Sequence, residues 1–179
     1  IVIGLALAWG TMIIDYRLLR AYTPFIWGLG VLGLALLLIP GIGTEINGAR
    51  AWIPLPGGLQ IQPAEIAKIS IILGISMLLS ERTHNSDEPS NRDVLKALGV
   101  AGLPILLILA QPDVGTVFII SASVVTIIAV SGAPTRWVVG LLLAALIGGF
   151  GAVQTGVIND YQLKRLQSFV DPSADIQGA

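Results

Sequence analysis

Two aspartates near the end of the chain have the type and spacing of a catalytic pair. Asp171 and Asp175 lie four residues apart in a turn-rich stretch. Paired carboxylates can serve as a general base, but aspartates in loops more often form turns. The residues alone leave both interpretations open.

A glutamate and a lysine stand at the start of an apolar stretch. Glu65 and Lys68 are three residues apart, shortly after Pro63, so a helix would place them on one face, where they can pair. Proline suits the first helical position and a carboxylate in the first turn complements the helix dipole, which explains the pattern as a local ion pair. Ionisable groups inside a membrane span, however, usually face a polar cavity and serve a function.

Asp113 and Arg50 are further candidates for binding. Asp113 follows Pro112 at a break between two apolar runs, where it can cap the next helix or add a second carboxylate near Glu65. Arg50 stands two residues before Trp52. Such a pair at a membrane interface is usually an anchor, whereas a functional guanidinium would bind phosphate.

The remaining polar signals are a basic pair and a single histidine. Lys164 and Arg165 lie among apolar residues at helical spacing, which predicts a helix lying on the membrane surface. His84 occurs in a polar loop, and the chain has no cysteine. Disulfides, thiolate metal sites, cysteine nucleophiles and histidine metal clusters are therefore excluded within this chain.

The composition is that of a membrane protein. Hydrophobic residues make up 54% of the 179 residues, charged residues make up 12%, and the mean hydropathy is +0.84. Soluble domains carry about 25% charged residues. The net charge of −1 supplies no basic field to hold a nucleic acid. We therefore expect a multi-pass membrane protein that binds no nucleic acid.

The elements that position these residues are expected to be membrane spans, each needing about 20 mostly apolar residues. We predict one all-α membrane domain over 1–179. Its six spans are expected near 1–14, 21–39, 64–80, 96–110, 115–131 and 137–154, followed by a loop at 155–179. The first run is too short for a full span, so we interpret it as a span cut by a fragment boundary. The run 97–132 is too long for one helix, so we expect it to fold back at Gln111-Pro112-Asp113, with only a kink at Pro104.

The positive residues in the loops predict the orientation. Loops 15–20, 81–96 and 132–136 together carry six Lys and Arg residues, whereas 40–63, 111–114 and 155–179 carry three. The more positive side faces the cytoplasm in most membrane proteins. All the candidate residues named above are then expected at the outer face.

Four motifs in order resemble one protein family. They are NGARAWI, QPAEIAK, LAQPDVGT and YQLKRLQSFVDPSADIQGA, and Asp15-Tyr16-Arg17 adds to them. Together they resemble the SEDS family, the RodA, FtsW and SpoVE type peptidoglycan glycosyltransferases. The resemblance runs from about Gly4 to Ala179 and covers only the middle of a family fold of roughly ten spans.

The resemblance implies an inverting glycosyl transfer outside the bacterial cytoplasmic (inner) membrane. Such enzymes polymerise lipid II for elongation, shape or division, and a loop aspartate acts as general base. The DPxxDxxGA match gives Asp175, with Asp171 as the alternative; Ile176 departs from the proline that the family commonly has there. Arg50, Lys68, Lys164 and Arg165 are the outward cations that would stabilise the pyrophosphate, and Glu65 with Lys68 matches the family's polar pair.

The resemblance also implies partners and leaves two other functions open. The family works with a class B penicillin-binding protein, a transpeptidase. A divalent cation, Mg or Mn, could screen the pyrophosphate, although the sequence shows no dedicated metal cage. The alternatives are a lipid II flippase, in which Glu65 and Lys68 line a path, and a non-catalytic scaffold. We expect the 179 residues alone to be inactive.

Overall fold

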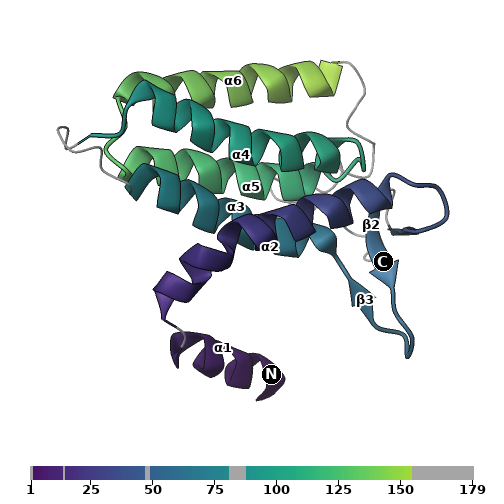
Figure 1. Cartoon of the computed structure of the whole chain (residues 1–179). Helices are drawn as coiled ribbons and strands as arrows, with labels where there is room; N and C mark the ends of the chain where they lie inside the picture. Colours follow the sequence, from purple (N-terminus) through teal and green to yellow (C-terminus); the bar gives the residue numbers. More distant parts are fainter. Residues whose placement is uncertain (1, 14, 47–48, 81–87, 155–179) are drawn as a thin grey trace, which may run out of the picture. The chain divides into compact units, whose positions relative to one another are not determined.

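The computed structural model describes residues 2–13, 15–46, 49–80 and 88–154. The elements in order are α1 (Val2–Ile13), α2 (Tyr16–Leu37), β1 (Thr44–Ile46), β2 (Ala49–Pro54), β3 (Gln60–Ile61), α3 (Pro63–Ser80), α4 (Asn91–Leu109), α5 (Val114–Val130) and α6 (Thr135–Gln154). The chain divides into two compact units, 1–138 and 139–179, which are described separately. The fold is mainly helical, as expected (Figure 1).

Each apolar run of the sequence forms a helix in the part of the chain that the structure describes. Two stretches, Arg17–Leu37 and Pro63–Ser80, are long and apolar enough to cross a membrane, and Val114–Val130 and Thr135–Gly151 are shorter apolar helices. Between α4 and α5 the chain turns back at residues 110–113, where the length argument places the break. The number of spans in the bilayer stays a prediction.

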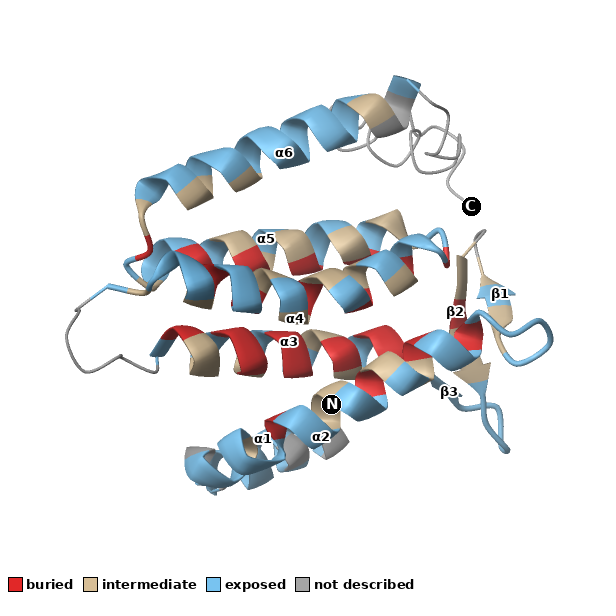
Figure 2. Cartoon of the chain, turned by 45° about the horizontal axis from the view of Figure 1, so that its top comes forward, coloured by how far each residue is buried: buried red, intermediate tan, exposed pale blue. Residues whose placement is uncertain are grey.

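Helix α3 is the centre of the first unit, with α2, α4 and α5 packed against it. Its buried residues are Pro63, Ala64, Ala67, Ser70, Ile71, Gly74, Ile75 and Leu79, and Figure 2 shows how they line the helix. Outward faces keep large apolar side chains exposed; Phe118 is 75% and Val130 is 82% exposed. Exposed apolar surface of this kind suits lipid rather than water.

Glycine lets α2 approach α3 closely. A Cβ added at Gly30 would lie 2.9 Å from the Ala67 Cα, and one added at Gly33 would lie 3.0 Å from the Pro63 Cβ. A larger residue at position 30 would push against backbone, which cannot move aside as a flexible side chain can. Small residues at such contacts are typical of helix packing in membranes.

A second α2 contact satisfies a backbone group that proline leaves free. Pro104 has no N–H, so it cannot bond the carbonyl of Val100, four residues earlier. The indole Nε1 of Trp27 on α2 donates to that carbonyl oxygen at 3.0 Å. Helix α4 continues through Pro104 without a break, and α2 is tied to α4 at the position where α4 lacks its own bond.

We expect Trp27→Phe to lower the free energy of unfolding by about 1 kcal/mol, because the Val100 carbonyl is left without a donor. Pro104→Ala supplies the matched background, since the new Ala N–H restores the helical bond. In that background the effect of Trp27→Phe should shrink. Denaturant unfolding of the intact protein in detergent measures both; equal losses in the two backgrounds would contradict this account.

The segment between α2 and α3 forms an antiparallel three-stranded sheet in the order β1-β2-β3, which the sequence analysis did not anticipate. Ile46 pairs with Ala49, so a two-residue connection joins β1 to β2. Its sequence, Asn-Gly, is the strongest short-range signal for a hairpin. Strands β2 and β3 are joined by a second turn, which Leu55 closes by donating its N–H to the Leu59 carbonyl at 2.8 Å.

Helix α4 begins with a reciprocal cap. The Ser90 Oγ accepts from the Asp93 N–H, and the Asp93 carboxylate accepts from both the N–H and the Oγ of Ser90. These bonds, the side-chain bond first, lower the pKa of Asp93 below its ordinary value of 3.8. Because the folded pKa is the lower one, the cap stabilises fully above the unfolded value and loses this contribution as pH falls through the folded pKa.

Candidate functional site

The start of α3 holds the predicted Glu65–Lys68 pair. Pro63 is the first residue of the helix, and the Glu65 N–H donates to the Gln62 carbonyl at 3.0 Å. One turn further on, the Lys68 Nζ donates to Glu65 Oε1 at 2.7 Å. The Lys68 side chain is 21% exposed and that of Glu65 is 57% exposed, so the ammonium lies against protein while the carboxylate remains open.

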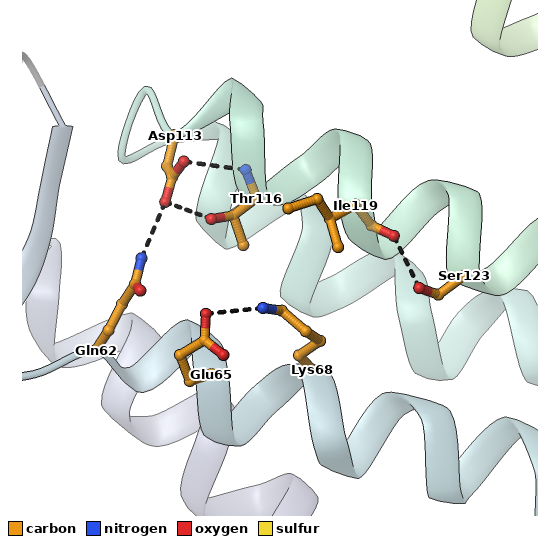
Figure 3. A network of polar contacts seen from close by, with 7 residues as sticks. All are labelled: Gln62, Glu65, Lys68, Asp113, Thr116, Ile119 and Ser123. Carbon is orange, nitrogen blue, oxygen red and sulfur yellow. Dashed lines mark hydrogen bonds and ion pairs between the residues drawn. The ribbon is translucent and has the colours of Figure 1, made fainter. Parts of the chain in front are cut away.

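Asp113 caps α5 and also reaches α3. Its Oδ1 accepts from the Thr116 N–H at 3.1 Å, and its Oδ2 accepts from the Thr116 hydroxyl at 2.7 Å. The same Oδ2 accepts from the Gln62 amide at 3.3 Å. Asp113 is therefore a helix cap, and its bond to Gln62 brings it beside the start of α3, while its role in binding stays a prediction (Figure 3).

Gln111 fixes the turn that carries Asp113. Its Nε2 donates to the Leu34 carbonyl at 2.8 Å, 77 residues away in sequence, and the side chain is 1% exposed. Leu34 belongs to the last turn of α2, whose carbonyls lack helical partners. The turn between α4 and α5 is therefore tied to the end of α2. The Gln111 Oε1 is buried and has no hydrogen-bond partner among the residues that the structure describes.

The polar cluster at the α3–α5 contact consists of two groups drawn side by side in Figure 3: Glu65 with Lys68, and Asp113 with Gln62 and Thr116. Further along α5, the Ser123 hydroxyl donates to the Ile119 carbonyl at 2.9 Å (Figure 3). The cluster holds two carboxylates and one ammonium. Such a set can accept protons, bind hydroxyl groups and offer one cation to an anionic group.

Arg50 lies apart from this bonding network, on β2. Its Nη2 is 3.9 Å from Glu45 Oε2, and both side chains are largely exposed, at 43% and 59%. An exposed pair at this distance contributes little to stability. The guanidinium therefore remains accessible to a further anionic partner.

Four predicted site residues lie outside the described residues: Asp171, Asp175, Lys164 and Arg165. Their roles stay predictions. Within the described part of the chain, no three His, Cys, Asp or Glu residues group as metal ligands would. Glu65 and Asp113 alone offer too few oxygen ligands for a dedicated Mg or Mn cage there.

The site residues predicted from the sequence did not include Gln62, Gln111 and Thr116, which the structure adds to this arrangement. Each glutamine directly precedes a proline, at Pro63 and at Pro112, and Thr116 stands three residues after Asp113, the spacing of a capping contact. A Gln-Pro pair thus occurs at the start of α3 and again just before α5, and this repeat is the sequence signal for the two segments that meet at the cluster. Nothing in the sequence indicated that Gln111 would bond to Leu34.

Comparisons with known proteins agree on one family. The family model described as "Cell cycle protein", for FtsW, RodA and SpoVE, matches residues 1–179. The probable peptidoglycan glycosyltransferase FtsW of Nitrosococcus halophilus is 36% identical over 98% of this chain and 44% of its own length. Stage V sporulation protein E of Bacillus subtilis is 33% identical over 99% of this chain and 47% of its own length.

Solved structures show the same relationship. The crystal structure of the Thermus thermophilus rod shape determining protein RodA matches 80% of this chain and 46% of that chain, with a TM-score of 0.66 and 34% identity. A structure titled for the coordination of polymerization and crosslinking by a peptidoglycan synthase complex matches 95% of this chain and 48% of that chain, with a TM-score of 0.70 and 30% identity. The chain thus spans about half the length of the relatives it matches.

Proposed function

We propose, from the premise that this chain belongs to the FtsW, RodA and SpoVE family of cell cycle proteins, that it is part of a membrane-embedded peptidoglycan glycosyltransferase. The intact protein would polymerise lipid II into glycan strands at the outer face of the bacterial cytoplasmic membrane. The observation that carries the proposal is the match over the whole chain to relatives named for this activity. The polar cluster of Glu65, Lys68 and Asp113 supports it, because it gathers charge at one end of otherwise apolar helices.

The chemistry is an inverting displacement. The 4-hydroxyl oxygen of an incoming lipid II sugar forms a bond to the anomeric carbon of the growing strand, and the bond from that carbon to the pyrophosphate breaks. The hydroxyl proton passes to a carboxylate, for which we propose Asp175, with Asp171 as the alternative. Negative charge grows on the departing undecaprenyl pyrophosphate, and a positioned cation stabilises it.

Lys68 is the cation best placed for the pyrophosphate within the described part of the chain. Glu65 holds its ammonium at 2.7 Å, and protein covers most of its side chain, so its position is fixed before substrate binds. Preorganised charge of this kind needs no rearrangement during the reaction. We assign Asp113 and Glu65 to binding the polar part of the substrate, with Arg50, Lys164 and Arg165 as further phosphate contacts.

A class B penicillin-binding protein is the proposed partner, since the structure of a synthase that couples polymerization to crosslinking matches 95% of this chain. We expect the 179 residues alone to form no glycan polymer, because more than half of each matched relative lies outside them.

A lipid II flippase is the second candidate function. The observation that favours it is an ionisable pair, Glu65 and Lys68, inside a helix long and apolar enough to span the membrane. Ionisable groups at such depth often line a transport path. A non-catalytic scaffold is the third candidate, with the exposed apolar helix faces as docking surfaces.

The deciding experiment reconstitutes the intact protein with its transpeptidase partner in liposomes containing lipid II. We expect glycan polymer to accumulate from lipid II supplied in the outer leaflet, where no translocation is needed. Transfer of lipid II between leaflets without polymer would favour the flippase. A stable complex with neither activity would favour the scaffold.

A further inference from the structure

The turn between β2 and β3 carries an exposed apolar tip that the glycosyl transfer does not use. Leu59 is 68% exposed, Ile61 is 43% exposed and Leu55 is 37% exposed. The tip between the two leucines is Pro56-Gly57-Gly58, and the two glycines have φ values of 86° and 79°. The turn is therefore narrow, with leucines on both sides and no side chain at its apex.

No charged residue occurs from Ala51 to Ala64, which covers the tip and both arms of the hairpin. An exposed loop in water usually carries charged residues. This one presents leucine, isoleucine, proline and glycine instead, so its composition matches an apolar environment.

The backbone of the tip has few free donors. Pro54 and Pro56 have no N–H, and the Leu55 N–H is bonded to the Leu59 carbonyl at 2.8 Å. Residues 54–56 therefore present no unpaired N–H group. Loops are excluded from lipid because burying unpaired backbone groups there costs free energy. Residues 54–56 carry no unpaired N–H group, so this cost is lower for the tip. The two glycines at the apex still need polar partners, which headgroups supply at a shallow depth.

The β2–β3 hairpin points across the helix axes, so its tip is displaced sideways from the ends of α2 and α3 rather than continuing along their axes. Strand β2 packs against the α2 and α3 ends between which the sheet is inserted. From there β2 and β3 lead away across the direction of the helix axes (Figure 1), and the turned view shows the same course (Figure 2). If α2 and α3 cross the membrane, a hairpin with this course runs along the membrane surface.

We infer that the β2–β3 tip inserts Leu55 and Leu59 shallowly into the lipid bilayer, at the boundary between headgroups and acyl chains on the outer face. Trp52 on β2, half-buried, then lies nearer the helices at the level where tryptophan is usually found. The occupant of this surface is lipid, because the tip carries no charged side chain that would recognise a protein partner, and its leucine, isoleucine, proline and glycine residues match the boundary between headgroups and acyl chains. The insertion would hold the strand that leads into Gln62 and Glu65.

The test places a single cysteine at Leu59 in the intact protein, with any cysteine outside the 179 residues replaced by serine, and labels it with the fluorophore NBD. The protein is reconstituted in phosphatidylglycerol and phosphatidylethanolamine nanodiscs, with or without 5-doxyl phosphatidylcholine. Glu45→Cys on β1 is the matched control, because it lies in the same sheet and is largely exposed. We expect doxyl lipid to quench the label at Leu59 at least about twofold more than at Glu45, and aqueous iodide to show the opposite order.

Two results would overturn the inference. Stronger iodide quenching at Leu59 would show a tip in water, and quenching by neither reagent would show a tip covered by protein. Because NBD is itself apolar, a second measurement uses the unlabelled thiol. A charged methanethiosulfonate reagent should modify Leu59→Cys about tenfold more slowly than Glu45→Cys, since a thiolate forms poorly in apolar surroundings. Leu55→Cys repeats the measurement if Leu59→Cys fails to fold, and equal rates at the tip and control positions contradict insertion.

Discussion

Replacing Lys68 by methionine is expected to lower the rate of lipid II polymerisation by the intact protein about 10²- to 10³-fold, the loss typical of removing one preorganised charge from a transition state. The change keeps an unbranched side chain of nearly the same length and removes the ammonium that lies 2.7 Å from Glu65. Substrate binding should change less than kcat, because the charge on the pyrophosphate grows as its bond breaks. Steady-state kinetics in liposomes separates the two.

Lys96→Met is the matched control. Lys96 also pairs with a carboxylate three residues before it, Asp93, at 3.6 Å, and it is 64% exposed on the face predicted to be cytoplasmic. Both substitutions break an ion pair of the same spacing, and such pairs contribute at most about 1 kcal/mol to stability. Equal activity in the two variants would show that the Lys68 charge takes no part in the reaction.

The local parts of this cluster were within reach of the sequence. Three short-range signals were available: the proline before Glu65, the three-residue spacing to Lys68 and the break at Asp113. The rules for helix starts, side-chain pairs and caps predict the local geometry from them. The structure adds that Gln62 and Asp113, 51 residues apart, are hydrogen-bonded. The sequence could place each residue on its helix, but it could not show that the two helix starts meet.

The long-range contacts depend on how the helices pack. Trp27 lies within a predicted span, and the structure shows that it donates to a carbonyl that Pro104 leaves free. Gln111 looked like part of a loop, yet it is buried against the end of α2. Both contacts depend on how α2 packs against its neighbours, and Gly30 and Gly33 permit its close approach to α3. Glycine is frequent throughout the chain, so its frequency alone did not identify these two positions.

The β-sheet shows a different limit. The 40–63 segment is rich in proline and glycine, and those residues predicted turns. Its strands are short, with two to six residues each. An alternation of apolar and polar residues, which would indicate a strand, cannot be recognised over so few positions. The Asn-Gly pair was the available signal, and it was outweighed by the membrane pattern on both sides.

Replacing Asp175 by alanine is expected to lower polymerisation about 10²- to 10⁴-fold, the usual contribution of a general base. The place of Asp175 before Gly178-Ala179 is the one for which the resemblance implies the base, and without its carboxylate the proposed acceptor for the proton of the attacking hydroxyl is lost. Asp175→Asn should be equally inactive, because it keeps the size of the side chain but cannot take up a proton. The complex with the transpeptidase should still form, since the change removes one carboxylate and leaves the rest of the chain unaltered.

The comparison between Asp175 and Asp171 decides which carboxylate is the base. Asp171 precedes Pro172, where a turn aspartate is common, so Asp171→Ala should reduce polymerisation much less. Asp160→Ala, in the same polar tail, is the control for general damage to the segment. A large loss in Asp171→Ala alone would move the base to that residue. Full polymerisation in both Asp175→Ala and Asp171→Ala would show that neither aspartate accepts the proton. The proposal of a carboxylate base at these positions would then be wrong.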